Sequence, residues 1–270
     1  MSTLTKYAGV TVLLLWTALG TGGLSARGPA GATLKFTVLY DNYLFREGTK
    51  ADWGFSCLVE GPEKTILFDT GTNPDILMQN VDALQVDLKK VDLVVLSHAH
   101  EDHTGGLPAV LQRNPAVEVL FPVSFGTAFA DKVAKMGATP RTVDKPVEIC
   151  HNVFLTGELG DRIKETSLVV DTPRGLVVVT GCSHPGIVDI LKRAKEIRDK
   201  PIHLVFGGFH LGGTPDAGIR DILAAFKELG VERCGATHCT GDHQIERFKA
   251  AFGDRFQPMG TGRTIEVAGF

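Results

Sequence analysis

A cluster of potential metal ligands lies at residues 98–103, where the chain reads His-Ala-His-Glu-Asp-His. Four of these side chains, those of His98, His100, Asp102 and His103, carry imidazole or carboxylate groups, which are the usual ligands of zinc and related divalent metals. The apolar run 92–96 before them predicts a strand, and a glycine pair follows them. A strand end with a loop after it lets several side chains meet at one point, so we expect this segment to bind metal.

Two later histidines repeat this arrangement. His184 follows the apolar run 176–180, and His238 follows the run 233–237. We expect both imidazoles to join the metal site, because each stands just after a predicted strand. Cys182, beside His184, is either a thiolate ligand or a small residue that packs beneath the site. Cys239 is expected to pack.

His210 and Asp69 are candidates for supporting roles. His210 follows the predicted strand 202–206 and two glycines, which permit close backbone approach. We expect it to hydrogen-bond substrate or to orient a ligand. Asp69 ends a predicted strand and either orients an imidazole or forms a turn. The other histidines are expected to have no role at the site: His151, His203 and His243.

The elements that must position these residues alternate between strands and helices. Helices are predicted at 74–84, 124–136, 186–199, 216–229 and 242–252, the first with Asn73 as its N-cap. Residues 138–165 contain turn formers and short β pieces. Strands are predicted at 34–40, 55–60, 65–69, 92–96, 117–121, 167–171, 176–180, 202–206, 233–237 and 264–268. This order predicts an α/β fold, an αβ/βα sandwich of four layers in which two mixed sheets are flanked by helices.

The N-terminus predicts an export signal at residues 1–26. Lys6 precedes an apolar run at 7–19, and small residues follow at 20–26. The run is short for a membrane span of about 20 residues, so no stable span is expected after cleavage. We expect a periplasmic or secreted protein with one domain at 34–270; the alternative is an N-terminal membrane anchor. The five cysteines then leave at least one thiol unpaired.

The composition suits one large globular domain, and we expect its partner to be a small-molecule substrate. Of 270 residues, 43% are hydrophobic, which can supply a sizeable core, and the formal net charge is -3. That charge provides no electrostatic basis for nucleic acid as the main ligand.

The histidine motifs resemble those of a known superfamily. Residues 98–103 resemble the H-x-H-x-D-H signature of the metallo-β-lactamase fold superfamily, and residues 67–71 resemble its first motif. The resemblance extends over residues 34–268. Residues 181–186, 207–210 and 238–241 are similar to one branch, the metal-dependent hydrolases of β-lactamase superfamily II. That branch includes proteins described as dihydropterin–ribofuranosylaminobenzene-phosphate synthases.

The resemblance implies a dinuclear centre, most simply of zinc, with manganese or iron as alternatives. His98 and His100 would bind one ion, and Asp102, His103 and His238 would bind the other. Two positions depart from the superfamily pattern. Cys182 stands where a bridging Asp is usual, and no histidine matches the third motif. We therefore expect His184 to complete the first ion's ligands.

The implied function is a metal-dependent hydrolase. A metal-bound hydroxide would attack an ester, amide or phosphoester, oriented by Asp102, while His210 would stabilise charge on oxygen. The alternative is a metal-dependent transferase that resembles the synthase named above. A diiron redox enzyme of this fold would have Glu where His100 stands, and a non-enzymatic binding module would not need the whole ligand set.

Overall fold

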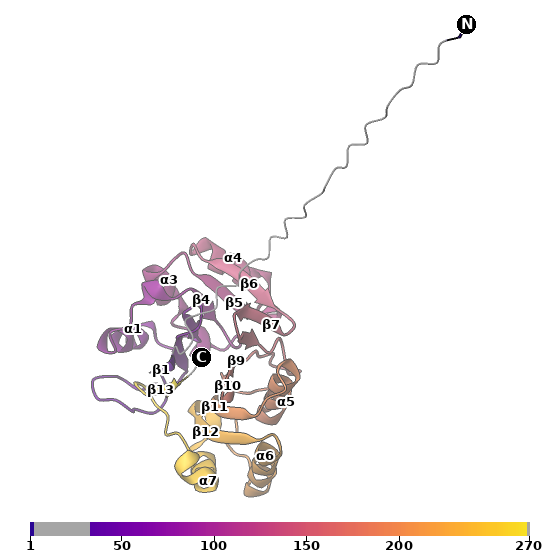
Figure 1. Cartoon of the computed structure of the whole chain (residues 1–270). Coiled ribbons are helices and arrows are strands. Elements are labelled where there is room, and N and C mark those ends of the chain that lie inside the picture. Colours follow the sequence, from indigo (N-terminus) through magenta and orange to yellow (C-terminus); the bar gives the residue numbers. More distant parts are fainter. Residues whose placement is uncertain (3–32, 269–270) are drawn as a thin grey trace.

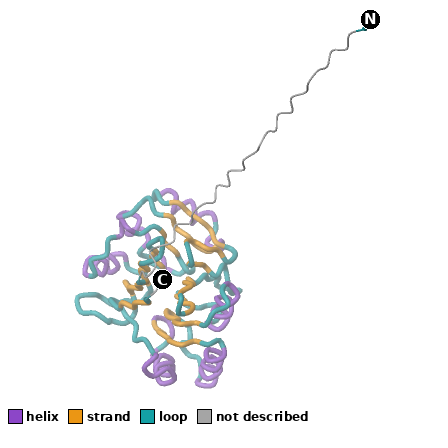
Figure 2. The backbone as a smooth tube through the Cα atoms, in the orientation of Figure 1, coloured by secondary structure: helices purple, strands orange, loops and turns teal. Residues whose placement is uncertain are grey.

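The computed structural model describes residues 1–2 and 33–268, so almost all of the predicted export signal lies outside the described residues (Figure 1, Figure 2). Two sheets form the centre of the fold. The first has seven strands in the order β13-β1-β2-β3-β4-β5-β6. These strands are β1 (Leu34–Tyr40), β2 (Ser56–Glu60), β3 (Ile66–Phe68), β4 (Leu93–Val95), β5 (Glu118–Pro122), β6 (Thr139–Val143) and β13 (Thr264–Val267).

The second sheet has six strands in the order β12-β11-β10-β9-β8-β7. They are β7 (Val147–Cys150), β8 (Val153–Leu155), β9 (Leu168–Thr172), β10 (Gly175–Thr180), β11 (Ile202–Gly208) and β12 (Val231–Thr237). Its last three strands are parallel neighbours, with Thr180 level with Gly207 and Gly208 level with Thr237. The carboxyl ends of β10, β11 and β12 therefore meet at one edge of the sheet.

Alternation of apolar side chains along the strands creates three cores. Val177 and Val179 of β10 point to the space between the sheets, whereas Val178 points outward to the helices. The outer face of the second sheet is covered by α5 (Ile187–Ile197), α6 (Asp216–Glu228) and α7 (Asp242–Phe252), and that of the first by α1 (Pro74–Ala83), α3 (Leu107–Arg113) and α4 (Thr127–Lys135). Figure 1 shows the two helical layers on opposite sides of the sheets. The predicted sandwich of four layers is confirmed.

Five short elements of the described residues lie at the strand ends or between the longer helices. The helix α2 (Glu101–Thr104) carries two of the predicted ligands. The other four are single 3-10 turns, at Leu88–Lys90, Val123–Phe125, His238–Thr240 and Gly253–Arg255. The turn at His238–Thr240, η3, begins at a predicted ligand. None of the helices within residues 33–268 is long and apolar enough to cross a membrane.

The structure differs from the predicted elements at three places. The helix predicted from 124 begins only at Thr127, because Gly126 with φ +78° separates it from a 3-10 turn. The short β pieces predicted without bounds within residues 138–165 are three strands, β6, β7 and β8. The helix α3 has Pro108 in its first turn and was not predicted. The predicted N-cap is confirmed, since the Asn73 side chain accepts hydrogen bonds from the N–H groups of Asp75 and Ile76.

Candidate metal centre

The first group of donors contains His98, His100 and His184. The ring nitrogen Nε2 of His98 lies 3.0 Å from Nδ1 of His100. One donor atom from each of the three imidazoles lies within 4.8 Å of the other two. The Nε2 atom of His184 is buried and has no hydrogen-bond partner. A buried polar atom without a partner is costly, and a cation at this point would satisfy it.

The second group contains Asp102, His103, His238 and Cys182. The Nε2 atoms of His103 and His238 are 3.2 Å apart, and Cys182 Sγ lies 3.2 Å from His103 Nε2. A carboxylate oxygen of Asp102 lies 3.3 Å from His238 Nε2 and 3.6 Å from His103 Nε2. The donors come from three distant parts of the chain, α2 and the ends of β10 and β12, which the fold brings together.

These separations fit a tetrahedral ion. Zinc–nitrogen bonds of about 2.0–2.1 Å place two ligand atoms of a tetrahedron about 3.3 Å apart. The spacings of 3.2 to 3.6 Å in the second group are close to this value. The residues therefore fit the divalent ions that the sequence predicts, three donors in the first group and four in the second.

Hydrogen bonds on the far side of the rings orient three of the imidazoles. His103 Nδ1 donates to Asp69 at 2.7 Å, and His238 Nδ1 donates to Asn42 Oδ1 at 2.9 Å. The Ser97 hydroxyl donates to Asp69, so it accepts from His98 Nδ1 at 2.9 Å. With a proton on each Nδ1, the lone pair of each Nε2 faces the centre, as metal ligation requires.

A buried carboxylate shapes the loop after β10. Glu165 Oε1 accepts hydrogen bonds from the backbone N–H groups of Cys182 and Ser183, and Oε2 accepts one from His184, all at 2.9 Å. Ser183 has a positive φ of +64°, a strained conformation for a residue other than glycine. The three hydrogen bonds hold that strained backbone in place, and with it the side chains of Cys182 and His184.

The charges of the groups in the centre depend on burial and on their neighbours. Burial and the adjacent imidazoles hold the pKa of His98 far below its ordinary value, so this ring is neutral. Burial and the neighbouring His210 lower the pKa of His184 to about 4. Burial opposes ionisation of Asp102, but hydrogen bonding and the charges of His238 and His103 lower its pKa overall. The rings of His98 and His184 are therefore neutral at neutral pH, and Asp102 is ionised. Burial opposes protonation of His103, but the neighbouring Asp69 raises its pKa to about 9, so a metal ion that binds this ring would displace its proton.

Asp69→Asn is expected to weaken metal binding by about 10–100-fold, the usual effect of changing a partner of a ligating histidine. An amide NH₂ opposite His103 Nδ1 would favour the tautomer with its proton on Nε2, which blocks ligation. Asp69 has φ +58°, a conformation that asparagine adopts readily, so the backbone should be preserved. Competition titration with a chelator measures the affinity. Unchanged affinity for both ions would contradict this role of Asp69.

The absence of a side chain at Gly208 allows β11 to end close to the centre. A Cβ atom there would lie 2.4 Å from the Gly181 carbonyl oxygen and 2.7 Å from Cys239 Sγ. The predicted close backbone approach is therefore present. His210, two residues later, has φ +50°, and His238 has φ +53°. Strained residues of this kind cluster at functional sites.

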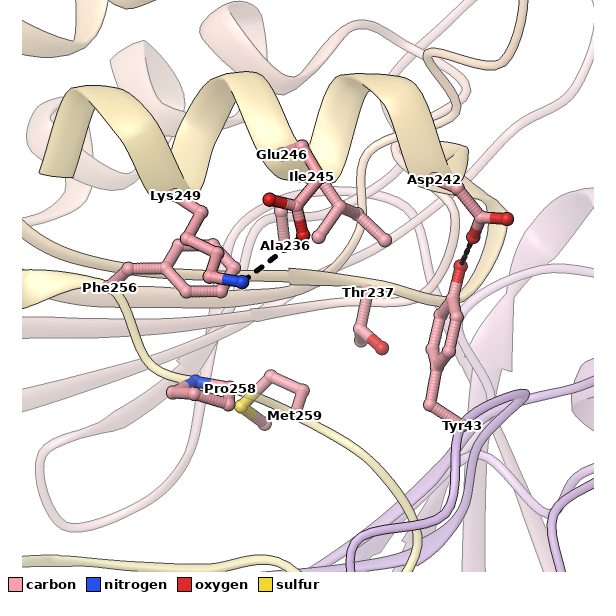
Figure 3. A pocket seen from close by; sticks show the side chains of 10 residues that line it. All are labelled: Tyr43, Ala236, Thr237, Asp242, Ile245, Glu246, Lys249, Phe256, Pro258 and Met259. Carbon is pink, nitrogen blue, oxygen red and sulfur yellow. Dashed lines mark hydrogen bonds and ion pairs between the residues drawn. The ribbon is translucent and has the colours of Figure 1, made fainter. Parts of the chain in front are cut away.

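Two cavities lie near the centre, and only one reaches the donor groups. A cavity of about 700 Å³ is lined by His184 and His210 together with Gly160, Asp161, Arg162, Ile163 and Pro185. The other, of about 300 Å³, lies between α7 and the segment 256–259 (Figure 3). Thr237, which precedes the predicted ligand His238, lines this cavity, and Tyr43 closes one side by donating a hydrogen bond to Asp242. The first cavity is therefore the candidate substrate site.

All six predicted ligands lie in the two donor groups. Asp102, predicted to be catalytic, belongs to the second group, and His210 lines the larger cavity. Asp69 orients His103, one of its two predicted alternatives. The Cys182 thiol lies among the ligands of the second group. Cys239, which was expected to pack, places its sulfur within 4.8 Å of that thiol. The other histidines lie outside both groups: His151, His203 and His243.

Sequence reasoning missed three residues that support the ligands. Asn42 stands two residues after the end of β1, so its place after a strand could have marked it. Trp53 Nε1 donates a hydrogen bond to Asp102 at 2.9 Å from an irregular loop. Glu165 lies at the end of the segment 138–165, and the residue types around it do not indicate a buried carboxylate.

Comparisons with known proteins agree with this geometry. The sequence profile described as the Metallo-beta-lactamase superfamily matches residues 54–182. A protein of Methanocaldococcus jannaschii named 7,8-dihydropterin-6-methyl-4-(beta-D-ribofuranosyl)-aminobenzene-5'-phosphate synthase is 29% identical over 79% of this chain and 89% of its own length.

Solved structures give the same result. A metal-dependent hydrolase of the beta-lactamase superfamily is 31% identical, with a TM-score of 0.75 over 87% of this chain and 99% of its own. The metallo-beta-lactamase fold protein YhfI from Bacillus subtilis, 18% identical with a TM-score of 0.64, shares the fold. The chain therefore belongs to the metallo-β-lactamase superfamily, whose fold binds divalent metal ions.

Proposed function

We propose that the protein is a metal-dependent hydrolase with two ions, most simply zinc. His98, His100 and His184 would hold one ion, and Asp102, His103, His238 and Cys182 the other. One observation carries the proposal. Hydrogen bonds to Nδ1 orient the buried rings of His98, His103 and His238, so that their Nε2 atoms point toward the centre. When bound, such ions lower the pKa of water and polarise the bond to be cleaved.

The remaining groups supply binding and proton transfer. A substrate in the cavity of about 700 Å³ would lie against His184 and His210. The imidazole of His210 can donate a hydrogen bond to an oxygen on which negative charge develops. The Asp102 carboxylate is ionised and is oriented by Trp53, so it can accept a proton from the attacking water.

A substrate panel tests the proposal. Protein loaded with zinc should hydrolyse at least one of four classes of compound: phosphodiesters, lactones, thioesters and β-lactams. Activity should disappear on chelation and return with added metal. Turnover that survives complete removal of metal would contradict the proposal.

A second candidate is a transferase, favoured by the similarity to the Methanocaldococcus jannaschii synthase over most of both chains. The same donor groups would then activate a diphosphate leaving group on a pterin. Absence of hydrolysis with all four classes, together with metal-dependent turnover of a pterin diphosphate, would replace the first candidate with this one.

Export is also part of the proposal. Its support is the sequence of residues 1–26, with Lys6 before the apolar run 7–19. Protein recovered from the producing cell should start near residue 27, which N-terminal sequencing can measure. An intact N-terminus on protein attached to the membrane would instead show an anchor.

A further inference from the structure

Three parallel strands each place one more donor at the same distance beyond their ends. Cys182, His210 and Cys239 each stand two residues after the last residue of β10, β11 and β12. Because these strands are adjacent and their ends are level, the three side chains meet at one edge of the sheet. Their donor atoms, two sulfurs and one ring nitrogen, all lie within 4.8 Å of one another.

We propose that Cys182, His210 and Cys239 form a third cation site, which shares Cys182 with the second donor group and prefers thiophilic metals. Zinc–sulfur bonds of about 2.3 Å would place two sulfur ligands of a tetrahedral ion about 3.8 Å apart. The donor atoms of this group lie within 4.8 Å of one another, which is compatible with that spacing. Two thiolates and one imidazole favour zinc, cadmium or copper(I) over magnesium or manganese. Binding would displace the thiol protons of both cysteines.

Two features of the backbone suit this site. Gly208 leaves room for Cys239 Sγ, which a Cβ atom at that position would meet at 2.7 Å. His210, with φ +50°, has a left-handed backbone conformation where the chain leaves β11. Cys182 belongs to both this group and the group of Asp102, His103 and His238. Its thiolate would therefore bridge the new ion and the second ion of the centre.

Cadmium(II) is a suitable probe, because cadmium–thiolate bonds absorb in the near ultraviolet. Metal-free full-length protein is titrated with cadmium, bound ions are counted, and sulfur ligands are measured by X-ray absorption spectroscopy. The three donor groups lead us to expect three ions per chain, one of them with two sulfur ligands. Cys239→Ser and His210→Ala should each remove one ion, and Cys239→Ser should also remove the signal of paired sulfurs.

Cys150→Ala is the matched control, since Cys150 lies in β7 and belongs to none of the groups. It should bind as many ions as the wild type. Circular dichroism establishes that each variant is folded. If Cys239→Ser does not fold, the loss of one ion is tested with His210→Ala alone. Binding of only two ions by the wild type would overturn the proposal. An unchanged ion count and sulfur count in Cys239→Ser would also overturn it. Both results are counts of bound ions or sulfur ligands and do not depend on hydrolytic activity. Failure of this proposal can therefore be distinguished from failure of the proposed hydrolase function.

Discussion

His100→Ala should remove the ion of the first donor group and lower kcat/KM by about 1,000-fold or more. The group would keep only His98 and His184, fewer than the three protein ligands of typical catalytic zinc sites. A metal ion contributes several kcal/mol of transition-state stabilisation, and each 1.36 kcal/mol corresponds to about tenfold in rate. Metal analysis and steady-state kinetics on the same preparation measure both effects.

This variant separates loss of metal from loss of fold. His100 is exposed, so truncation of its side chain should leave the packing intact. The control is His243→Ala, which removes another exposed imidazole that pairs with Asp216 and belongs to none of the donor groups. The control should retain wild-type metal content and activity. Full metal content in His100→Ala would show that the first group is not a metal site.

The ligands could be predicted from the sequence because each follows a strand. Parallel strands place their carboxyl ends at one edge, so His184 and His238 could be assigned to the centre without knowing the distance between them in space. The local pattern also indicated Asp69, although an aspartate in a turn has the same appearance. The hydrogen bond between His103 Nδ1 and this aspartate shows which alternative holds.

The sheet assignment of the last strand could not be predicted in the same way. β13 pairs with β1, more than 200 residues earlier in the chain, so the C-terminal segment returns to the first sheet. Alternation of apolar residues identifies a strand but not its partner. The bounds of the strands within 138–165 could not be predicted either, because β6, β7 and β8 are short and are separated by turn formers.

Residues that hold the ligands were harder to find than the ligands themselves. Glu165 contacts only backbone N–H groups, and such contacts leave no pattern in side-chain types. Asn42 orients His238 from a position 196 residues earlier in the chain. Both contacts are products of the tertiary fold.

Glu165→Ala should destabilise the protein by at least about 3 kcal/mol and disrupt both donor groups. Three backbone N–H groups would lose their acceptor, and each unsatisfied buried group costs about 1–3 kcal/mol. The positive φ of Ser183 would then be without support, so Cys182 and His184 would leave their positions. Denaturant unfolding of the metal-free variant measures the stability, and metal analysis of the folded fraction measures occupancy.

Glu165→Gln is the matched comparison because it retains one carbonyl oxygen. That oxygen can still accept from Cys182 and Ser183, which share Oε1 in the wild type, while the amide NH₂ faces the His184 N–H. The Gln variant should therefore be more stable than the Ala variant but should bind the first ion, which His184 ligates, more weakly than the wild type. Equal stability of the wild type and the Ala variant would mean that the loop after β10 holds its shape without this carboxylate. The strain at Ser183 would then have to be balanced by its own hydroxyl, which donates to the Gly208 carbonyl at 2.7 Å.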